Sequence, residues 1–116
     1  MDTRDNKDLV VLCAASQYDR KYYLNPAFGK LPQAVKDQLQ IACVVFTEQA
    51  GGTIEILFDE DGEMLIQTNG EAMDINYDEI GAGLLVKELR KEKAELFEEL
   101  TLFYRIVFLG EKLDLD

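Results

Sequence analysis

A β-hairpin between residues 53 and 68 constrains the fold of this chain more than any other sequence feature. Residues 53–58 alternate between apolar and polar side chains, and residues 64–68 can return beside them. The intervening turn, 59–62, ends in a glycine at the position where a positive φ is needed. Because a two-stranded ribbon is only marginally stable in water, its apolar face must pack on further elements.

The segments on either side of the hairpin have helical periodicity. Pro32 suits a first helical position, apolar residues recur on one face up to Phe46, and Gly51-Gly52 ends the pattern. Residues 41–46 are rich enough in β-formers that they fit either the last helical turns or a strand. Residues 76–79 offer helix-capping side chains, and the sequence after them predicts one long helix to Leu109, with Gly110 as its stop.

The first thirty residues are less regular. Residues 9–15 are aliphatic and predict a strand buried on both faces, although a buried helical turn has the same pattern. Residues 16–30 predict an ordered connector whose tyrosines lie on the core with their hydroxyls in water. Residues 69–76 predict a loop or a short third strand. We expect a disordered terminus at 1–8, one domain at 9–110 and a tail at 111–116.

Together these patterns predict a single α+β domain. It combines a short antiparallel sheet, a mid-chain helix and a long C-terminal helix packed across the sheet. A chain of 116 residues would remove about 65% of its unfolded surface from water, which is enough for a real core.

The charge of the chain argues against two classes of partner. Twelve Lys or Arg face twenty-three Asp or Glu, a formal charge of −11, which disfavours binding to nucleic acid or to an anionic membrane. The polar start does not resemble a signal peptide, and the longest apolar run is far shorter than the ~20 residues of a membrane span. We therefore expect a cytoplasmic protein.

The acids are concentrated in one part of the sequence. No Lys or Arg occurs between Lys36 and Lys87, whereas eleven acids do. This distribution predicts a one-sided field near the hairpin, and hence a basic protein partner that would meet the molecule there.

The usual catalytic machinery is scarce. The chain has no His and a single Ser, Ser16, so a nucleophile would have to be Ser16 or Cys13 beside Lys21 or beside a carboxylate base. This spacing is a weak signal, and we predict no catalytic residue and no cofactor. Cys13 and Cys43 both lie in apolar runs and are predicted to be reduced, buried thiols.

Two short motifs were weighed as ligand sites. Asp59, Asp61 and Glu63 alternate around the turn, but the terminal acid of a calcium loop is missing, so we predict a solvated turn and no metal. Residues 81–83 read Gly-Ala-Gly and lack the remainder of a phosphate-binding motif.

Tyrosines and acids supply the candidate binding surface, because tyrosine is enriched at interfaces. The candidate binding residues are Lys21, Tyr22, Tyr23, Asn25, Asp59, Glu60, Asp61, Asp78 and Glu79.

A near-heptad stripe follows the last helix, interrupted by Lys93. Its apolar members are Leu89, Leu96, Leu100, Phe103 and Val107. Two interpretations stay open: a self-associating seam that forms a homodimer, or a core stripe that approximates a helical repeat.

The order of several short motifs resembles a family of small acidic proteins of unknown function from anaerobic Gram-positive bacteria. The resemblance covers residues 9–112 and implies one bacterial cytoplasmic domain, without any activity, ligand or catalytic residue. The motifs are Cys13-Ala14-Ala15-Ser16, Lys21-Tyr22-Tyr23-Leu24-Asn25-Pro26, Phe46-Thr47-Glu48, Gly51-Gly52, Phe58-Asp59-Glu60-Asp61-Gly62, Asp78-Glu79-Ile80-Gly81 and Leu109-Gly110-Glu111.

Two functional hypotheses follow. The first is a non-enzymatic binding or protein-interaction domain, with self-association through the C-terminal helix as one form of it. The alternative is a small-molecule-binding domain or enzyme that uses carboxylates and tyrosines in a pocket.

Overall fold

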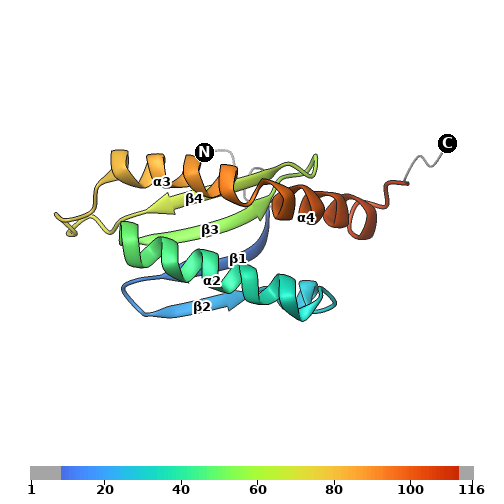
Figure 1. The fold of residues 1–116 in the computed structure, drawn as a ribbon, viewed down its shortest axis with the longest axis horizontal. Coiled ribbons are helices and arrows are strands. Elements are labelled where there is room, and N and C mark those ends of the chain that lie inside the picture. Colours follow the sequence, from blue (N-terminus) through green and yellow to red (C-terminus); the bar gives the residue numbers. More distant parts are fainter. Residues whose placement is uncertain (1–8, 113–116) are drawn as a thin grey trace.

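A four-stranded antiparallel sheet, with all helices packed on one of its faces, forms the frame of the molecule (Figure 1). The computed structural model describes residues 9–112, so the predicted terminus at 1–8 and the end of the predicted tail lie outside the described residues. The predicted single α+β domain is confirmed. The strand order is β2-β1-β3-β4, with β1 at Val10–Ser16, β2 at Lys21–Leu24, β3 at Thr53–Phe58 and β4 at Met64–Asn69.

The hairpin predicted from the alternating pattern is confirmed. Strand β3 pairs with β4 from Thr53 opposite Asn69 to Phe58 opposite Met64. Gly62 closes the turn with a φ of 84°, as the turn chemistry requires. Ile54, Ile56 and Phe58 share one face of β3 and are fully buried, so this face lies at the centre of the core.

Strand β1 contains a β-bulge between Val11 and Cys13. The bulge inserts one extra residue, and both Leu12 and Cys13 are fully buried as a result. Val11 and Ala14 on the other face are half-buried. The prediction of a strand in this segment is confirmed, but the prediction that both of its faces are buried is wrong, because the helices cover only the face of Cys13 and Ala15.

The prediction of an irregular connector over residues 16–30 is wrong for residues 21–24, which form the edge strand β2. They pair antiparallel with β1, and Tyr22 and Leu24 point to the core face while Lys21 and Tyr23 point away. The hydroxyl of Tyr22 is buried without a hydrogen-bond partner, which also corrects the prediction that it lies in water. After β2 comes a single 3-10 turn, η1, at Pro26–Phe28.

Helix α2 spans Gln33–Ala50, so residues 41–46 are helical rather than a strand. Its core face holds Leu39, Cys43 and Phe46, which pack over the sheet. Gly51 ends the helix with a φ of 74°, in agreement with the predicted glycine stop.

The prediction of a single long C-terminal helix is wrong, since this segment forms two helices. Helix α3 spans Glu79–Glu92, α4 spans Ala94–Val107, and the chain bends at Lys93, where φ is −109° and ψ is 21°. An unbroken helix over 79–107 would be about 43 Å long at 1.5 Å per residue. The bend keeps Leu89 before it and Leu96 after it on the same core. Within residues 9–112, no helix is long and apolar enough to cross a membrane.

Stacked aromatic rings attach α4 to the sheet. The rings of Phe58 and Tyr104 lie 4.2 Å apart between centroids and 7° from parallel, and Phe28 stacks on Phe108 at 4.6 Å. Aromatic pairs of this kind add about 0.5–1.5 kcal/mol beyond the area they bury. The end of the sheet near the hairpin turn is therefore covered by aromatic rings from α4.

Two glycines give a matched test of these backbone assignments. A Cβ at Gly62 would lie 2.8 Å from Cγ of Arg105 and would occupy a left-handed conformation, whereas a Cβ at Gly83 in α3 would meet open space. We expect Gly62→Ala to lower the free energy of unfolding by at least about 1–2 kcal/mol. Gly83→Ala should raise it by about 0.4–1 kcal/mol. Denaturant unfolding of both variants checks the pair, and equal effects would contradict the turn geometry.

Candidate functional site

The fold separates the nine predicted binding residues into three places. Lys21, Tyr22, Tyr23 and Asn25 lie on or beside the edge strand β2, Asp59–Asp61 at the hairpin turn, and Asp78–Glu79 at the start of α3. Figure 1 shows the hairpin turn and the start of α3 at opposite ends of β4. Six strand residues span about 20 Å. The predicted residues therefore do not form one site.

The candidate residues on or beside β2 differ in exposure: some have structural contacts and others face solvent. Asn25 is structural, because its Nδ2 donates to the Val11 carbonyl at 2.7 Å and its Oδ1 accepts from the Ala27 N–H at 3.0 Å. Tyr23 is half exposed on the open face of the sheet, beside exposed Lys21. Tyr22 instead points into the core.

A buried sulfur pair lies at the centre of the domain. The Sγ atoms of Cys13 and Cys43 are 3.7 Å apart, both thiols are free, and both side chains are fully buried. The hydrogen bond with Cys13 and burial raise the pKa of the Cys43 thiol. The prediction of reduced, buried thiols is confirmed, and a protonated, buried thiol is a poor nucleophile at neutral pH.

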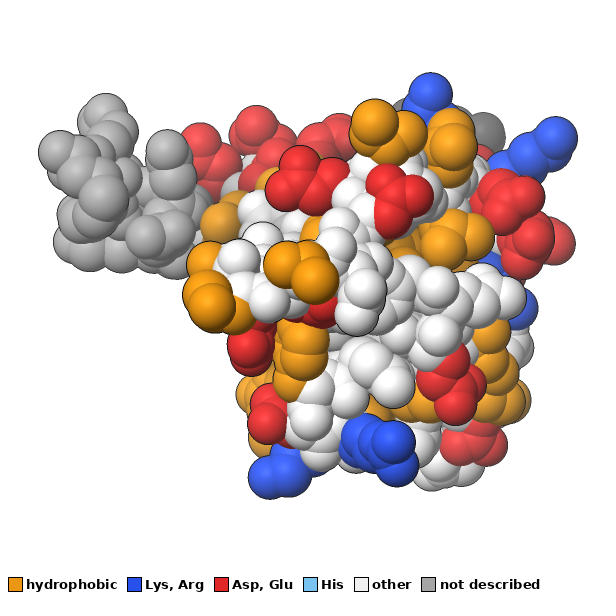
Figure 2. Space-filling model, turned by 90° about the vertical axis from the view of Figure 1, so that its left-hand side faces the viewer, with side chains coloured by type: hydrophobic (Ala, Val, Ile, Leu, Met, Phe, Trp, Pro, Cys, Tyr) orange, Lys and Arg blue, Asp and Glu red, His pale blue; other side chains and the backbone are white. Residues whose placement is uncertain are grey.

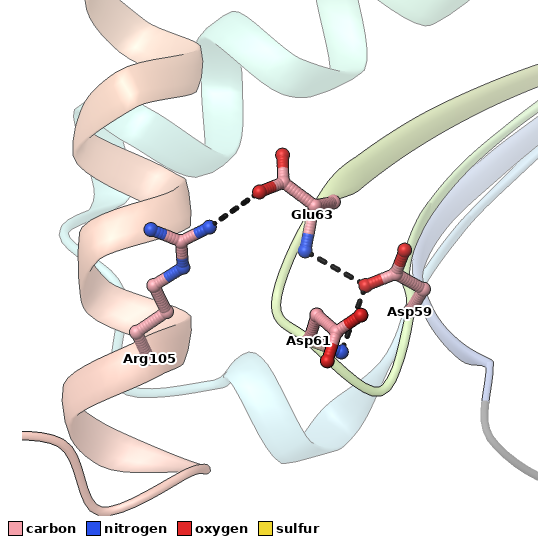
Figure 3. A network of polar contacts seen from close by, with 4 residues as sticks. All are labelled: Asp59, Asp61, Glu63 and Arg105. Atoms are coloured by element: carbon pink, nitrogen blue, oxygen red, sulfur yellow. Dashed lines mark hydrogen bonds and ion pairs between the residues drawn. The ribbon is translucent and has the colours of Figure 1, made fainter.

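The hairpin turn uses its acids to hold its own backbone (Figure 3). One carboxylate oxygen of Asp59, Oδ1, accepts from the N–H groups of Asp61 and Glu63, both at 2.9 Å. Arg105 of α4 donates through Nη2 to Oε1 of Glu63 at 2.8 Å. Asp59 and Glu63 are thus committed to the turn and to α4. No group of three or more potential metal ligands occurs within the described residues.

The loop between β4 and α3 is held from both sides. The hydroxyl of Tyr18, in the turn after β1, donates to Oδ2 of Asp74 at 2.7 Å and accepts from the Glu71 N–H at 2.9 Å. This hydrogen bond to Asp74 raises the pKa of Tyr18. The Tyr77 ring lies so close to Gly52 and Gly70 that a Cβ at either glycine would collide with it. Residues far apart in sequence therefore fix this loop.

The fixed loop presents apolar side chains to solvent. Met73 is 89% exposed and Ile75 94%, while Ile80 and Leu84 on α3 are 80% and 60% exposed. We call these four residues the loop–α3 surface. In Figure 2, which faces this end of the molecule, hydrophobic side chains lie among acidic ones.

Asp78 and Glu79 lie between Ile75 and Ile80 in the sequence, where the loop enters α3. Asp78 caps α3, since its Oδ1 accepts from the Ile80 N–H at 3.1 Å. Glu79 follows in the first helical turn, where a negative charge interacts favourably with the helix dipole. These two are the predicted binding residues that lie beside exposed apolar side chains.

A second apolar feature lies between α2 and α3. Ile41 and Val45 on α2 are 63% and 42% exposed and form one wall of a groove of about 250 Å³. The other wall belongs to α3. The remaining lining residues are Ala42, Phe46, Gln49, Leu85, Glu88, Leu89, Glu92 and Lys93.

Other hollows in the described part of the chain are lined by charged groups with structural roles or by residues from separate elements. One of about 650 Å³ contains Arg90 and Arg105, which bind the Met64 carbonyl at 3.2 Å and Glu63 respectively. Another of about 390 Å³ lies beside Tyr22 and includes neither Tyr23 nor Asp78 among its lining residues. A further hollow of about 260 Å³ is lined by Lys21, Tyr22 and Tyr23 together with Glu55, but not by Asp78. The predicted tyrosines therefore share a hollow with Glu55, whereas the predicted acids lie elsewhere on the fold.

The predicted oligomerisation residues are mostly engaged within the chain. Leu89, Leu96 and Leu100 are buried in the core and Phe103 packs against it, while Val107 is exposed. This burial agrees with the core-stripe interpretation. Self-association through this set stays a prediction, and it would require opening the domain.

The exposed apolar residues were not singled out from the sequence. Met73 and Ile75 flank an acid in a polar loop, which is a signal that sequence reasoning could have used. Ile41 and Val45 were hidden, because α2 carries apolar residues on both its core and outer faces and only packing reveals which face is covered.

The buried Tyr22 hydroxyl predicts a stabilising substitution. Because this hydroxyl has no partner, Tyr22→Phe should raise the free energy of unfolding by about 1 kcal/mol at pH 7. Burial raises the Tyr22 pKa above its ordinary 10.0, so the folded state binds the phenolic proton more tightly than the unfolded state. The stability that comes from this difference in pKa between the folded and unfolded states is complete below pH 10 and is lost as the pH rises above it. Unfolding curves at pH 7 and 10.5 should therefore show a smaller alkaline loss in Tyr22→Phe than in Tyr23→Phe, the exposed control.

The Tyr18 hydrogen bonds to the loop between β4 and α3 predict a local effect on hydrogen exchange. Tyr18→Phe removes the hydroxyl that joins Asp74 to the Glu71 N–H, so the loop should open more often. Hydrogen exchange at the Glu71 amide should accelerate, while amides of β3 keep their protection. Unchanged exchange at Glu71 would show that the loop is held without Tyr18.

Comparison with known proteins relates this chain to one family. No curated protein and no solved structure matches it. A family model described as a family of unknown function, DUF6145, matches residues 9–112, which is nearly the whole chain. The chain belongs to the family of unknown function DUF6145.

Proposed function

We propose that this chain is a cytoplasmic, non-enzymatic protein-interaction domain that binds a partner through the loop–α3 surface. The observation that carries the proposal is the fixed loop on which Met73 and Ile75 are almost fully exposed. Two free thiols in the core are consistent with a reducing compartment.

The energetics of the loop favour binding. Burying a large aliphatic side chain is worth about 1.5–3 kcal/mol, and this gain is unused at Met73 and Ile75. The contacts of Tyr18 and Tyr77 already order the loop backbone. A partner would therefore pay little for ordering the loop on association.

Charge favours a basic partner. Asp74, Asp78 and Glu79 alternate in sequence with the exposed apolar residues, and the sequence has no Lys or Arg from residue 37 to residue 86. Complementary charge would accelerate encounter and select among partners. The hairpin-turn acids Asp59–Asp61 lie at the other end of β4, so the surface we propose is not the hairpin turn.

The alternative of a small-molecule site or carboxylate enzyme has less support. Its tyrosines and carboxylates lie on different parts of the fold, and Asp59 is occupied by its own turn. Ser16 accepts the Asp19 N–H at 3.3 Å, a local turn contact.

Photo-crosslinking in cells tests the proposed surface. A photoreactive amino acid at Met73 or Ile75 should give a cross-linked product of discrete mass, because these side chains would lie against the partner. The same amino acid at Val107, which is also exposed, serves as the matched control and should give none. With the identified partner purified, Ile75→Asp should weaken binding tenfold or more, which is about 1.4 kcal/mol. Products from Val107 but from neither loop position would contradict the proposal.

A further inference from the structure

Two cysteine thiols are in contact inside the domain, and the proposed interaction does not use them. Cys13 belongs to β1 and Cys43 to α2, thirty residues later, and their Sγ atoms lie 3.7 Å apart. They are the only cysteines of the chain, and both side chains are fully buried. Each thiol can therefore reach the other, whereas neither can meet a thiol of another molecule while the domain stays folded.

The separation of the two sulfurs is short enough for a bond to form between them. A disulfide holds its sulfurs about 2.05 Å apart, so the two Sγ atoms would have to move about 1.7 Å closer. The β-bulge of β1 lies directly beside Cys13. Because a bulge locally disrupts the ladder of hydrogen bonds, β1 is least constrained by its neighbours where Cys13 would move.

The hydroxyl of Tyr22 is the third polar group in this part of the core. Burial raises the pKa of Tyr22, and the two nearby thiols add to the rise. The hydroxyl has no hydrogen-bond partner, which costs stability when both thiols are reduced. The oxygen of a sulfenic acid on a neighbouring sulfur would supply an acceptor for it.

A hollow of about 390 Å³ approaches the thiol pair from solvent. Tyr22, Val44 and Thr47 are among its lining residues. Val44 follows Cys43 in α2, and the buried Thr47 lies one helical turn after it. Hydrogen peroxide is neutral and little larger than water, so small local openings admit it more readily than a bulky disulfide.

We propose that Cys13 and Cys43 are a peroxide-sensitive pair that closes into an intramolecular disulfide between β1 and α2. One sulfur attacks hydrogen peroxide as a thiolate; the O–O bond breaks, a sulfenic acid forms, and the departing hydroxide becomes water with the proton of that thiol. The second sulfur then attacks the sulfenic sulfur; the S–S bond forms, the S–O bond breaks, and a second water leaves with the remaining thiol proton. One peroxide is reduced to two waters, and two thiols are oxidised to one disulfide.

The structure makes the first step slow and the second step fast. The hydrogen bond with Cys13 and burial raise the pKa of the Cys43 thiol, so little of its thiolate is present at neutral pH. Once a sulfenic acid forms, the second sulfur is already in contact with it and captures it within the molecule. The pair therefore responds to sustained peroxide, and the disulfide then prevents α2 from separating from the sheet.

Peroxide treatment of the purified full chain tests the proposal. The treated chain is unfolded in N-ethylmaleimide and its intact mass is measured. It should have lost two hydrogen atoms, taken up no maleimide and formed no disulfide-linked dimer, and dithiothreitol should restore both thiols. Because the bond closes a loop of thirty residues, the Tm of the oxidised chain should rise by about 5–15 °C.

Two variants serve as controls. Ala42→Cys combined with Cys43→Ala keeps the composition and moves the thiol to the adjacent buried position of α2. This variant should retain two maleimide-reactive thiols after the same treatment. Cys43→Ala leaves Cys13 without a second sulfur, so dimedone should trap its sulfenic acid, whereas the wild-type chain should give no dimedone adduct.

Four results would overturn the proposal. Two maleimides on the treated wild-type chain would show that the thiols do not react, and added oxygen atoms without a disulfide would show that the second sulfur does not capture the first. An equal yield of disulfide in the Ala42→Cys, Cys43→Ala variant would mean that oxidation passes through the unfolded chain. A lower Tm after oxidation would mean that the fold does not accommodate the bond. The proposed function is independent of these outcomes, because the loop cross-linking tests it separately.

Discussion

Burial of one face of β3 is the interaction on which the rest of the structure depends. Ile54, Ile56 and Phe58 are fully buried on this face, and α2, α3 and α4 all contribute to the core that covers it. The stacking of Phe58 on Tyr104 fixes α4, and the bend at Lys93 lets α3 and α4 share that core. All the helices therefore lie on one side of the sheet, and the other face is left with Tyr23 exposed to solvent.

The same architecture divides the charge. No Lys or Arg interrupts the acids of residues 55–79 in the sequence. In the fold, β4 separates these acids into one group at the hairpin turn and another in the loop before α3. At physiological salt, exposed charges farther apart than about 8 Å are largely screened from one another. Each end of β4 therefore acts as a local acidic surface, and the formal charge of −11 does not describe what a partner would meet.

Most of the polar residues that look functional have structural partners. Asp59 holds the hairpin turn, Asn25 joins β1 to η1, and Tyr18 fixes the loop through Asp74. Once these roles are assigned, the unexplained features are large apolar side chains on ordered backbone, above all Met73, Ile75 and Ile41. A domain that keeps such groups in water forgoes burial energy, which is the physical argument for interaction as the function.

Features that depend on neighbours along the chain follow from the amino-acid sequence alone. The alternating pattern of 53–58, the positive φ at Gly62 and the end of α2 at Gly51 all follow from local periodicity and backbone sterics. Other features emerge only in the folded molecule: residues 21–24 pair with β1, Tyr18 bonds Asp74 fifty-six positions away, and Ile41 faces water. These features depend on partners distant in sequence, whose pairing and burial energy cannot be read from any local window.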